Sequence, residues 1–289
     1  MSSAGSRLRT AIQERPILIP GVFNALTAKM AERVGFRALY LSGGALSAGW
    51  AGLPDVGLLG MTEFAEQAAI LAGATSLPLL CDADTGFGEA IHVERTVRLY
   101  EQAGAAGLHI EDQEIPKRCG HLSGKALVDA DIMASKVRAA VAARLDPDFV
   151  VVARTDARSV LGFDEALDRA SRYVDAGADW IFPEALESID EFARFAEVIS
   201  VPLVANLTEF GRSPLPKFEV LAGMGYRAAL YPLTAFRVAM KAAEGALEEL
   251  HREQTQERLL PRMQTRAELY DLLGYEGWEA RDREYFGAD

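Results

Sequence analysis

The sequence predicts an α/β protein of the (β/α)8 TIM-barrel class, with additional helices towards its C-terminal end. Eight short runs have strand character, and most are apolar throughout, as parallel strands buried on both faces must be. Segments with helical periodicity separate these runs. Eight strands alternating with helices favour a barrel over the main alternative, a doubly wound open sheet. No segment rich in proline or glycine divides the 289 residues, so we expect one barrel domain over residues 1–289, with a helical extension from about residue 237.

The expected strands follow one another through the first 231 residues: Ile17–Val22, Ala38–Leu41, Leu77–Cys81, Gly107–Ile110, Phe149–Ala153, Trp180–Phe182, Val201–Ala205 and Ala228–Tyr231. The clearest helices between them repeat apolar residues every three to four positions: Ala25–Val34, Thr62–Ala72, His92–Ala103, Asp129–Ala143 and Asp164–Ala176. Beyond the last strand, Arg237–Gln254 and Met263–Leu273 are expected to form helices that barrel closure does not require. We expect this extension to pack either on a neighbouring subunit or on its own barrel.

A weak internal repeat supports the same interpretation. At four places an expected helix ends at a glycine and a strand follows directly, and these glycines are Gly35, Gly104, Gly177 and Gly225. Glycine accepts the left-handed conformation that stops a helix, so each is expected to be a helix C-cap.

Composition restricts the partners and the compartment. The formal net charge is -12 and no basic run is present, which argues against binding to nucleic acid or to acidic membranes. The two cysteines, Cys81 and Cys119, do not suggest a disulfide framework. No apolar run approaches membrane-spanning length, and residues 1–15 lack an apolar signal core. We therefore expect a cytoplasmic protein.

Polar residues stand at the C-terminal end of nearly every expected strand, where barrel enzymes place their active sites. Asparagine and aspartate also cap helices, but capping needs neither arginine nor glutamate at these positions. Since burying ionisable groups for packing alone is costly, their convergence predicts an enzyme. The set is Asn24, Ser42, Gly43, Gly44, Asp82, Asp84, Glu111, Arg154, Glu184, Asn206 and Thr208.

Three of these residues, Asp82, Asp84 and Glu111, are hard oxygen donors and predict a Mg²⁺ site in which Mn²⁺ is a possible substitute. The four histidines show no zinc-binding spacing. Arg154 is suited to clamp a substrate carboxylate through two parallel hydrogen bonds. The backbone N–H groups of a Ser42-Gly43-Gly44 turn are suited to bind another carboxylate.

A long polar loop from Asp112 to Val128 follows the fourth expected strand and contains Lys117-Arg118-Cys119-Gly120-His121. Loops with glycines at such positions are typical of lids that close over a substrate. The cationic neighbours are expected to lower the pKa of the Cys119 thiol. The alternative is a solvated basic loop with an incidental cysteine. No lysine ends a strand, which argues against a Schiff-base aldolase, and no phosphate-binding motif indicates a nucleotide.

These motifs together resemble the isocitrate lyase/phosphoenolpyruvate mutase superfamily. The resemblance extends from about Arg9 to Tyr275, and it is carried by the Lys117–His121 segment with Tyr40–Gly44, Asp82–Gly88 and Ile110–Gln113. Further similarity, to the branch that cleaves 2-methylisocitrate, lies in Ala153–Ala157, Phe182–Ala185, Ala205–Gly211, Leu230–Leu233 and Met263–Arg266. The resemblance implies a barrel whose terminal helix is swapped between the subunits of a homotetramer. It also implies Mg²⁺-dependent cleavage to pyruvate and succinate, a step of propionate catabolism through the methylcitrate cycle.

The same resemblance implies roles for individual residues. Asp82 and Asp84 look like the metal-binding pair, with Glu111 nearby, and Cys119 looks like the general acid on the lid. Tyr40, Glu111 and Arg154 remain candidates for the base that removes the substrate's hydroxyl proton. The implied substrate-binding residues are Ser42, Gly43, Gly44, Cys119, Gly120, His121, Arg154, Glu184, Asn206, Thr208, Arg237 and Arg266.

The substrate within the superfamily is less narrowly indicated. Leu122-Ser123-Gly124 after the lid histidine is similar to isocitrate lyases, whereas Arg118, the short chain, and Phe182 with Leu230 are similar to the methyl-substrate enzymes. The open alternatives are isocitrate, 2,3-dimethylmalate, another 2-alkylmalate and oxaloacetate. Cys119 argues against a phosphoryl mutase, because moving a phosphoryl group requires no carbon acid.

Overall fold

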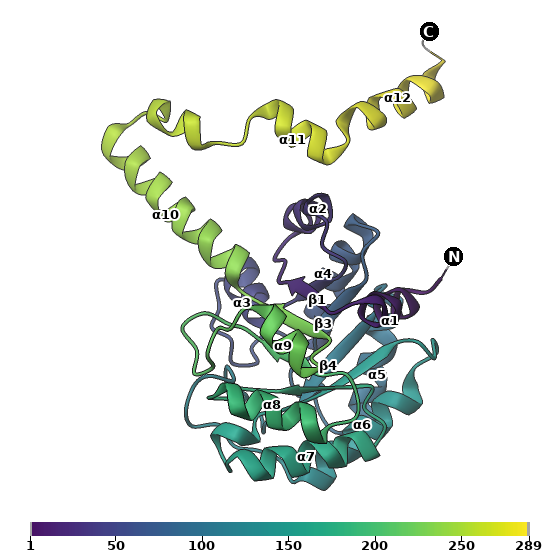
Figure 1. The fold of residues 1–289 in the computed structure, drawn as a ribbon. Helices are drawn as coiled ribbons and strands as arrows, with labels where there is room; N and C mark the ends of the chain where they lie inside the picture. The colour runs from purple at the N-terminus through teal and green to yellow at the C-terminus, as the bar shows by residue number, and fades with distance from the viewer. Residues whose placement is uncertain (1, 288–289) are drawn as a thin grey trace. The chain divides into compact units, whose positions relative to one another are not determined.

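The computed structural model describes residues 2–287 and confirms the predicted fold class (Figure 1). In this part of the chain eight parallel strands alternate with helices: β1 (Ile17–Pro20), β2 (Leu39–Leu41), β3 (Leu79–Asp82), β4 (Gly107–Glu111), β5 (Val150–Thr155), β6 (Trp180–Pro183), β7 (Val204–Asn206) and β8 (Ala228–Tyr231). Ladders join β2-β3-β4-β5-β6 and β1-β8-β7. Single parallel bridges, Gly21 to Tyr40 and Ile181 to Leu203, connect these two sheets at both edges and close the ring of strands.

Helix α1 (Ala4–Glu14) precedes the first strand, and the other helices of this part lie between the strands: α2 (Ala25–Val34), α3 (Gly43–Ala51), α4 (Met61–Ala74), α5 (Ala90–Gln102), α6 (Ala130–Ala143), the short η1 (Ala157–Ser159), α7 (Phe163–Asp175), α8 (Ile189–Val198) and α9 (Phe218–Met224). The four glycines expected to stop helices, Gly35, Gly104, Gly177 and Gly225, have φ angles of 99°, 84°, 101° and 111°, which confirms that prediction. The sequence patterns did not single out α1, α3, α8 or α9.

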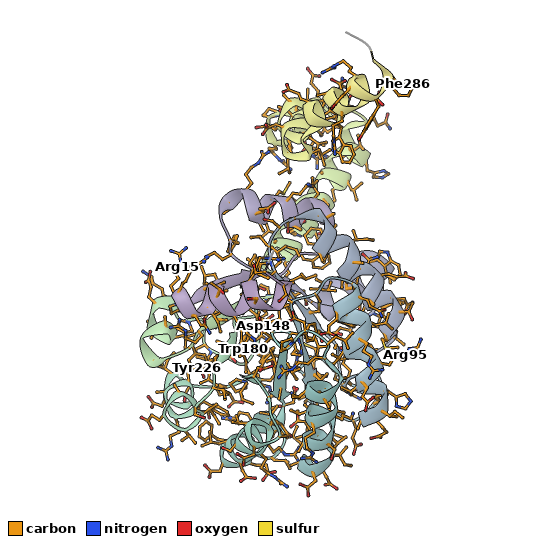
Figure 2. All side chains as sticks on the ribbon, turned by 90° about the vertical axis from the view of Figure 1, so that its right-hand side faces the viewer. Arg15, Arg95, Asp148, Trp180, Tyr226 and Phe286 are labelled. Atoms are coloured by element: carbon orange, nitrogen blue, oxygen red, sulfur yellow. The ribbon has the colours of Figure 1, made fainter. Side chains whose placement is uncertain are left out.

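Apolar packing closes the N-terminal end of the barrel. Leu8 and Ile12 of α1 are buried against residues that point into the barrel, such as Val152 and Trp180. Gly5 lets α1 approach closely, because a Cβ atom at this position would lie 2.4 Å from the carbonyl oxygen of Asp148. Figure 2 shows Asp148 and Trp180 beside this helix. Since this end is filled, polar side chains can gather only at the opposite end, where the strands reach their C-termini.

The chain divides into two compact units, Met1–Phe236 and Arg237–Asp289. The second unit contains most of α10 (Thr234–Glu253), then η2 (Glu257–Arg262), α11 (Arg266–Leu273) and α12 (Tyr275–Phe286). The predicted additional C-terminal helices are therefore present, and their exchange between subunits stays a prediction. Among the described residues no helix has the length and apolar character needed to cross a membrane.

Candidate active site

The C-terminal ends of the strands and the loop after β4 surround a cavity of about 60 Å³. That volume holds a few water molecules, so the loop must move before a larger carboxylate can enter. Residues from most of the strand ends meet here with residues of the loop: Tyr40, Ser42, Gly44, Asp55, Asp82, Lys117, Arg118, Cys119, Gly120, His121, Arg154, Phe182, Glu184, Asn206, Thr208, Pro232 and Leu233.

Asp82, at the end of β3, is held by backbone donors. Its Oδ2 accepts a hydrogen bond from the Gly43 N–H at 3.0 Å, and its Oδ1 accepts one from the Asp84 N–H at 3.0 Å. The Ser42-Gly43-Gly44 segment thus has one of its N–H groups engaged by Asp82, while Ser42 and Gly44 line the cavity and their role in substrate binding stays a prediction. The segment begins α3, with Ser42 as the N-cap and the Gly43 N–H committed to Asp82. A helix start explains the glycine pair, because a Cβ atom on Gly43 would lie 2.8 Å from Asp82 Oδ2.

Lys117 of the loop reaches into the acidic pair. Its buried ammonium lies 2.7 Å from Asp84 Oδ1 and also pairs with Asp55. Burial raises the pKa of Asp84 to about 7, with the charge of Asp82 adding to the increase and Lys117 opposing it. Burial also raises the pKa of Asp82, but nearby positive charge outweighs burial and the net shift is downward. The sequence analysis missed Asp55, which lies in a Gly- and Pro-containing loop and carried no distinguishing motif.

His109 is a second residue that the sequence analysis did not assign to the site. It lies on β4 and is fully buried, with its Nε2 atom 2.8 Å from the Tyr40 hydroxyl and 3.6 Å from Asp82 Oδ1. Burial lowers its pKa to about 4, so the ring is neutral near pH 7. The His109 ring is the largest cause of the downward shift of the Asp82 pKa, followed by Lys117 and Arg154; near pH 7, where the ring is neutral, the positive charges beside Asp82 are those of Lys117 and Arg154. Burial, followed by the charge of Asp82, raises the pKa of Tyr40 well above its usual value.

Arg154, at the end of β5, is enclosed by carboxylates. Its Nε and Nη2 atoms donate to the two oxygens of Asp156 at 3.0 and 3.2 Å, and its Nη1 lies 3.1 Å from Glu111 Oε2. Its guanidinium also lies over the Phe182 ring, 5.2 Å from the centroid. Burial raises the pKa of Glu111 well above its usual value despite this arginine. The guanidinium that sequence reasoning assigned to a substrate carboxylate is thus already paired with protein carboxylates.

The loop after β4 covers the cavity with Cys119, Gly120 and His121. The Arg212 N–H donates to His121 Nδ1 at 3.0 Å, so Nε2 carries the proton, and Nε2 lies 2.7 Å from Glu184 Oε1. Asn206 also donates to Glu184, at 3.1 and 3.3 Å. A net excess of nearby positive charge, from Arg154 first, lowers the pKa of Glu184 against the effect of burial.

The expected effect on Cys119 is corrected by the structure. Burial raises the pKa of its thiol, because this effect exceeds the opposing effects of the hydrogen bond from the His121 backbone and of the Arg154 charge. The side chain is accordingly protonated near neutral pH. A protonated thiol is a proton donor rather than a nucleophile.

The remaining predicted residues, Thr208, Asn24, Arg237 and Arg266, lie in three different places. Thr208 is buried and lines the cavity, whereas Asn24 caps α2 by accepting a hydrogen bond from the Thr27 N–H at 2.9 Å. Arg237 and Arg266 belong to the second unit, and their role in substrate binding stays a prediction.

The pairing of the charged groups around the cavity bears on whether a divalent cation could bind there. Lys117 is paired with two carboxylates and Arg154 with three, so neither is left to neutralise an anionic substrate. Asp84 Oδ1 is buried against the Lys117 ammonium, and Glu111 Oε1 is a buried oxygen without a hydrogen-bond partner; such hard donors suit a divalent cation. Within residues 2–287 no group of three or more His, Cys, Asp or Glu side chains is placed to hold a metal ion. The donors fit a cation held by one or two carboxylates and completed by water and substrate.

Comparison with known proteins agrees with this arrangement. A family model described as phosphoenolpyruvate phosphomutase matches residues 8–251. The chain is 50% identical over 281 residues to a 2-methylisocitrate lyase of Aeropyrum pernix, covering 97% of this chain and 90% of the relative. The crystal structure of a 2,3-dimethylmalate lyase superposes with a TM-score of 0.92 at 35% identity, covering 99% of this chain and 96% of the other. A phosphonopyruvate hydrolase solved with oxalate and Mg²⁺ gives a TM-score of 0.89 at 32% identity, over 99% and 100% of the two chains.

Proposed function

The chain belongs to the phosphoenolpyruvate mutase family, and on that premise we propose that it is a carbon–carbon lyase that cleaves 2-methylisocitrate to pyruvate and succinate. The observation that carries the proposal is the position of the Cys119 thiol, which a closed loop places at a cavity lined by Asp82 and Arg154 and whose pKa is raised by burial. Breaking a C–C bond next to a carboxylate leaves a carbanion-like product that needs a proton, and a thiol can deliver it. A phosphoryl transfer would give this thiol no task.

We propose Asp82 and Asp84 as the residues that hold a divalent cation, Mg²⁺ or in its place Mn²⁺. Glu111 is a third candidate ligand nearby. The oxygen donors of these residues fit such an ion, and because Lys117 and Arg154 are already paired with protein carboxylates, the cation would add positive charge beside an anionic substrate. When bound, the cation would lower the pKa of the substrate hydroxyl and stabilise the charge that develops on the forming carbonyl.

Of the three candidate bases, Tyr40 is best placed to accept the hydroxyl proton. Tyr40 lines the cavity and its hydroxyl is hydrogen-bonded to His109, whereas the Arg154 guanidinium is held by Asp156 and Glu111. Glu111 is 1% exposed and is not among the described residues that line the cavity. Because burial raises the pKa of Tyr40, its phenolate form requires positive charge nearby, which is consistent with the adjacent Asp82–Asp84 pair as a cation site.

The substrate is proposed on the identity to relatives named 2-methylisocitrate lyase and on the apolar Phe182 in the cavity wall. Leu230 is fully buried and is not among the described residues that line the cavity, so Phe182 with Pro232 and Leu233 forms its apolar side. A methyl group in such a wall is worth only about 1–3 kcal/mol, so a sister activity on 2,3-dimethylmalate or another 2-alkylmalate is the second candidate. The solved 2,3-dimethylmalate lyase favours that second candidate.

The test is a substrate panel with the purified protein and Mg²⁺. We expect the highest kcat/KM for 2-methylisocitrate, measured as pyruvate release. Faster turnover of 2,3-dimethylmalate would refute 2-methylisocitrate as the substrate and support a 2,3-dimethylmalate lyase. Absence of turnover with every 2-hydroxy acid of the panel would refute the lyase proposal.

The setting of the enzyme follows from the reaction and the fold. We propose that it acts in the cytoplasm, in propionate breakdown, as a homotetramer that exchanges its C-terminal helices. The apolar side chains that the second unit exposes, among them Trp278, Tyr285 and Phe286, support an assembly of this kind. Size-exclusion chromatography with light scattering tests the tetramer, and a monomeric mass would contradict it.

A further inference from the structure

Lys125 is a buried lysine for which the proposed chemistry has no task. It lies near the end of the loop of residues 112–128, and its side chain is 1% exposed. Burying an ammonium group is costly unless it is paired and hydrogen-bonded. A lysine buried at this cost, between the exposed residues Gly124 and Ala126, therefore indicates a specific interaction.

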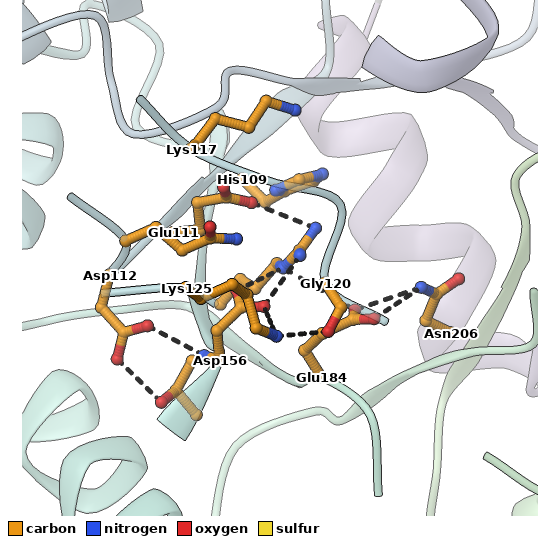
Figure 3. Close-up of polar contacts among 12 residues, drawn as sticks. His109, Glu111, Asp112, Lys117, Gly120, Lys125, Asp156, Glu184 and Asn206 are labelled. Atoms are coloured by element: carbon orange, nitrogen blue, oxygen red, sulfur yellow. Dashed lines mark hydrogen bonds and ion pairs between the residues drawn. The ribbon is translucent and has the colours of Figure 1, made fainter. Parts of the chain in front are cut away.

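The Lys125 amine joins the loop to the barrel wall. It donates to Asp156 Oδ1 at 2.7 Å, just beyond β5, and to the carbonyl oxygen of Gly120 five residues earlier in the loop. Figure 3 shows Lys125 between Asp156 and Gly120, with Glu184 beside them. One ammonium thus fixes the segment that carries Cys119 relative to a strand end.

The other ion pairs between this loop and the barrel involve residues that line or adjoin the cavity. Lys117 pairs with Asp55 and Asp84, and His121 pairs with Glu184, so both ties involve groups that line or adjoin the cavity. An incoming substrate or cation competes for those groups. Lys125 is not among the described residues that line the cavity, so its tie persists when the cavity is filled.

Asp156 also connects this tie to Arg154. The same carboxylate accepts from Lys125 and, through both of its oxygens, from the Arg154 guanidinium. Asp156 is itself fixed, because its backbone N–H donates to the buried Asp112 at 2.8 Å. A loop that lifts away would leave the Asp156 carboxylate to Arg154 alone, which changes the charge around that guanidinium.

From these contacts we infer that Lys125 is a positioning residue: a latch that holds the loop of residues 112–128 closed and sets Arg154 and Cys119 for reaction. It does not touch the substrate, and it acts through Gly120 and Asp156. The effect on turnover rests on the proposed lyase function, whereas the effect on loop closure does not.

The test compares Lys125→Met with the wild-type protein by alkylation of Cys119 with iodoacetamide in the absence of substrate, followed by mass spectrometry. Loss of a charge-assisted hydrogen bond should speed alkylation at least about tenfold, because the loop opens more often. Lys125→Arg, which keeps the charge and the donors, should stay within about threefold of wild type. Lys125→Gln replaces the methionine variant if that variant does not fold.

Lys136→Met is the matched control, because Lys136 is also buried and donates to a backbone carbonyl, that of Thr85, at 3.0 Å, but lies on α6 outside the loop. Its alkylation rate should equal that of wild type. A folded Lys125 variant that is alkylated at the wild-type rate, or an equal acceleration in Lys136→Met, would overturn the latch.

In the lyase assay Lys125→Met should lower kcat more than it raises KM, since the thiol is misplaced in the bound complex, and Lys125→Arg should restore most of the loss. Faster alkylation with unchanged kcat would overturn the positioning role. If the wild-type protein turns over no substrate, the proposed function is refuted. The alkylation rates would still show whether Lys125 holds the loop closed.

Discussion

Substituting Gly120 by alanine tests whether the closed loop is the reactive state. A Cβ atom at Gly120 would lie 2.4 Å from Arg154 Nη2 and 2.5 Å from Glu184 Cγ, and contacts under 3.0 Å force a shift. Both neighbours are buried and paired, so the loop rather than the wall must move. Overpacking of this kind costs about 1–3 kcal/mol, which corresponds to a roughly 5- to 150-fold loss of the closed state.

We therefore expect Gly120→Ala to reduce kcat/KM by about that factor, with little change in melting temperature, because the open loop leaves the barrel core intact. The assay is pyruvate release under Mg²⁺, with differential scanning fluorimetry on the same samples. Gly73→Ala is the matched control, because a Cβ atom on this α4 glycine meets no atom within 4 Å. Activity of Gly120→Ala within twofold of wild type would refute the importance of close approach at Gly120.

Three further predictions concern Cys119 and the buried support of the site. Cys119→Ser should lower kcat at least about 100-fold and leave oxalate binding, measured by calorimetry, unchanged, because the thiol acts after binding. Turnover equal to that of the wild type would exclude Cys119 from the mechanism. Alkylation of Cys119 should still accelerate above pH 9, since burial raises its pKa and only the thiolate reacts; a plateau below pH 8 would contradict this. Asp112→Asn should lower the melting temperature, measured by scanning fluorimetry, by roughly 6 °C or more. The reason is that the Asp112 carboxylate accepts hydrogen bonds from Thr155, Tyr173, Arg169 and a backbone N–H. A decrease of less than about 2 °C would contradict the stabilising role of these hydrogen bonds.

The barrel could be predicted because its signals are local. Apolar runs and glycine stops such as Gly35 and Gly177 each reflect one strand or one helix end, and the structure confirms those glycines. Helix α1 was missed because its contacts with the barrel interior, such as Leu8 with Trp180, join residues far apart in sequence. Helix α3 was missed because Ser42-Gly43-Gly44 has the composition of a turn.

Site residues that directly follow a strand could be predicted from the sequence. Residues elsewhere, and pKa shifts that depend on burial, could not. Asp82 and Arg154 stand at strand ends, and the structure places both at the cavity. His109 lies inside a strand and Asp55 in a loop, so neither carried a positional signal. The pKa of Cys119 was predicted in the wrong direction, because sequence shows the adjacent cations but not the burial of the thiol.

The most direct test of the account is pyruvate release from 2-methylisocitrate by the metal-stripped protein, with Mg²⁺ added back, for the wild type and Asp84→Asn. The account predicts no turnover after EDTA, recovery with Mg²⁺ or Mn²⁺ in the wild type, and a loss of at least about 100-fold in the variant, because the buried Asp84 carboxylate, paired here with the Lys117 ammonium, would be a ligand of the cation. Full activity in EDTA, or an Asp84→Asn variant as active as wild type, would contradict a cation-dependent lyase at this site.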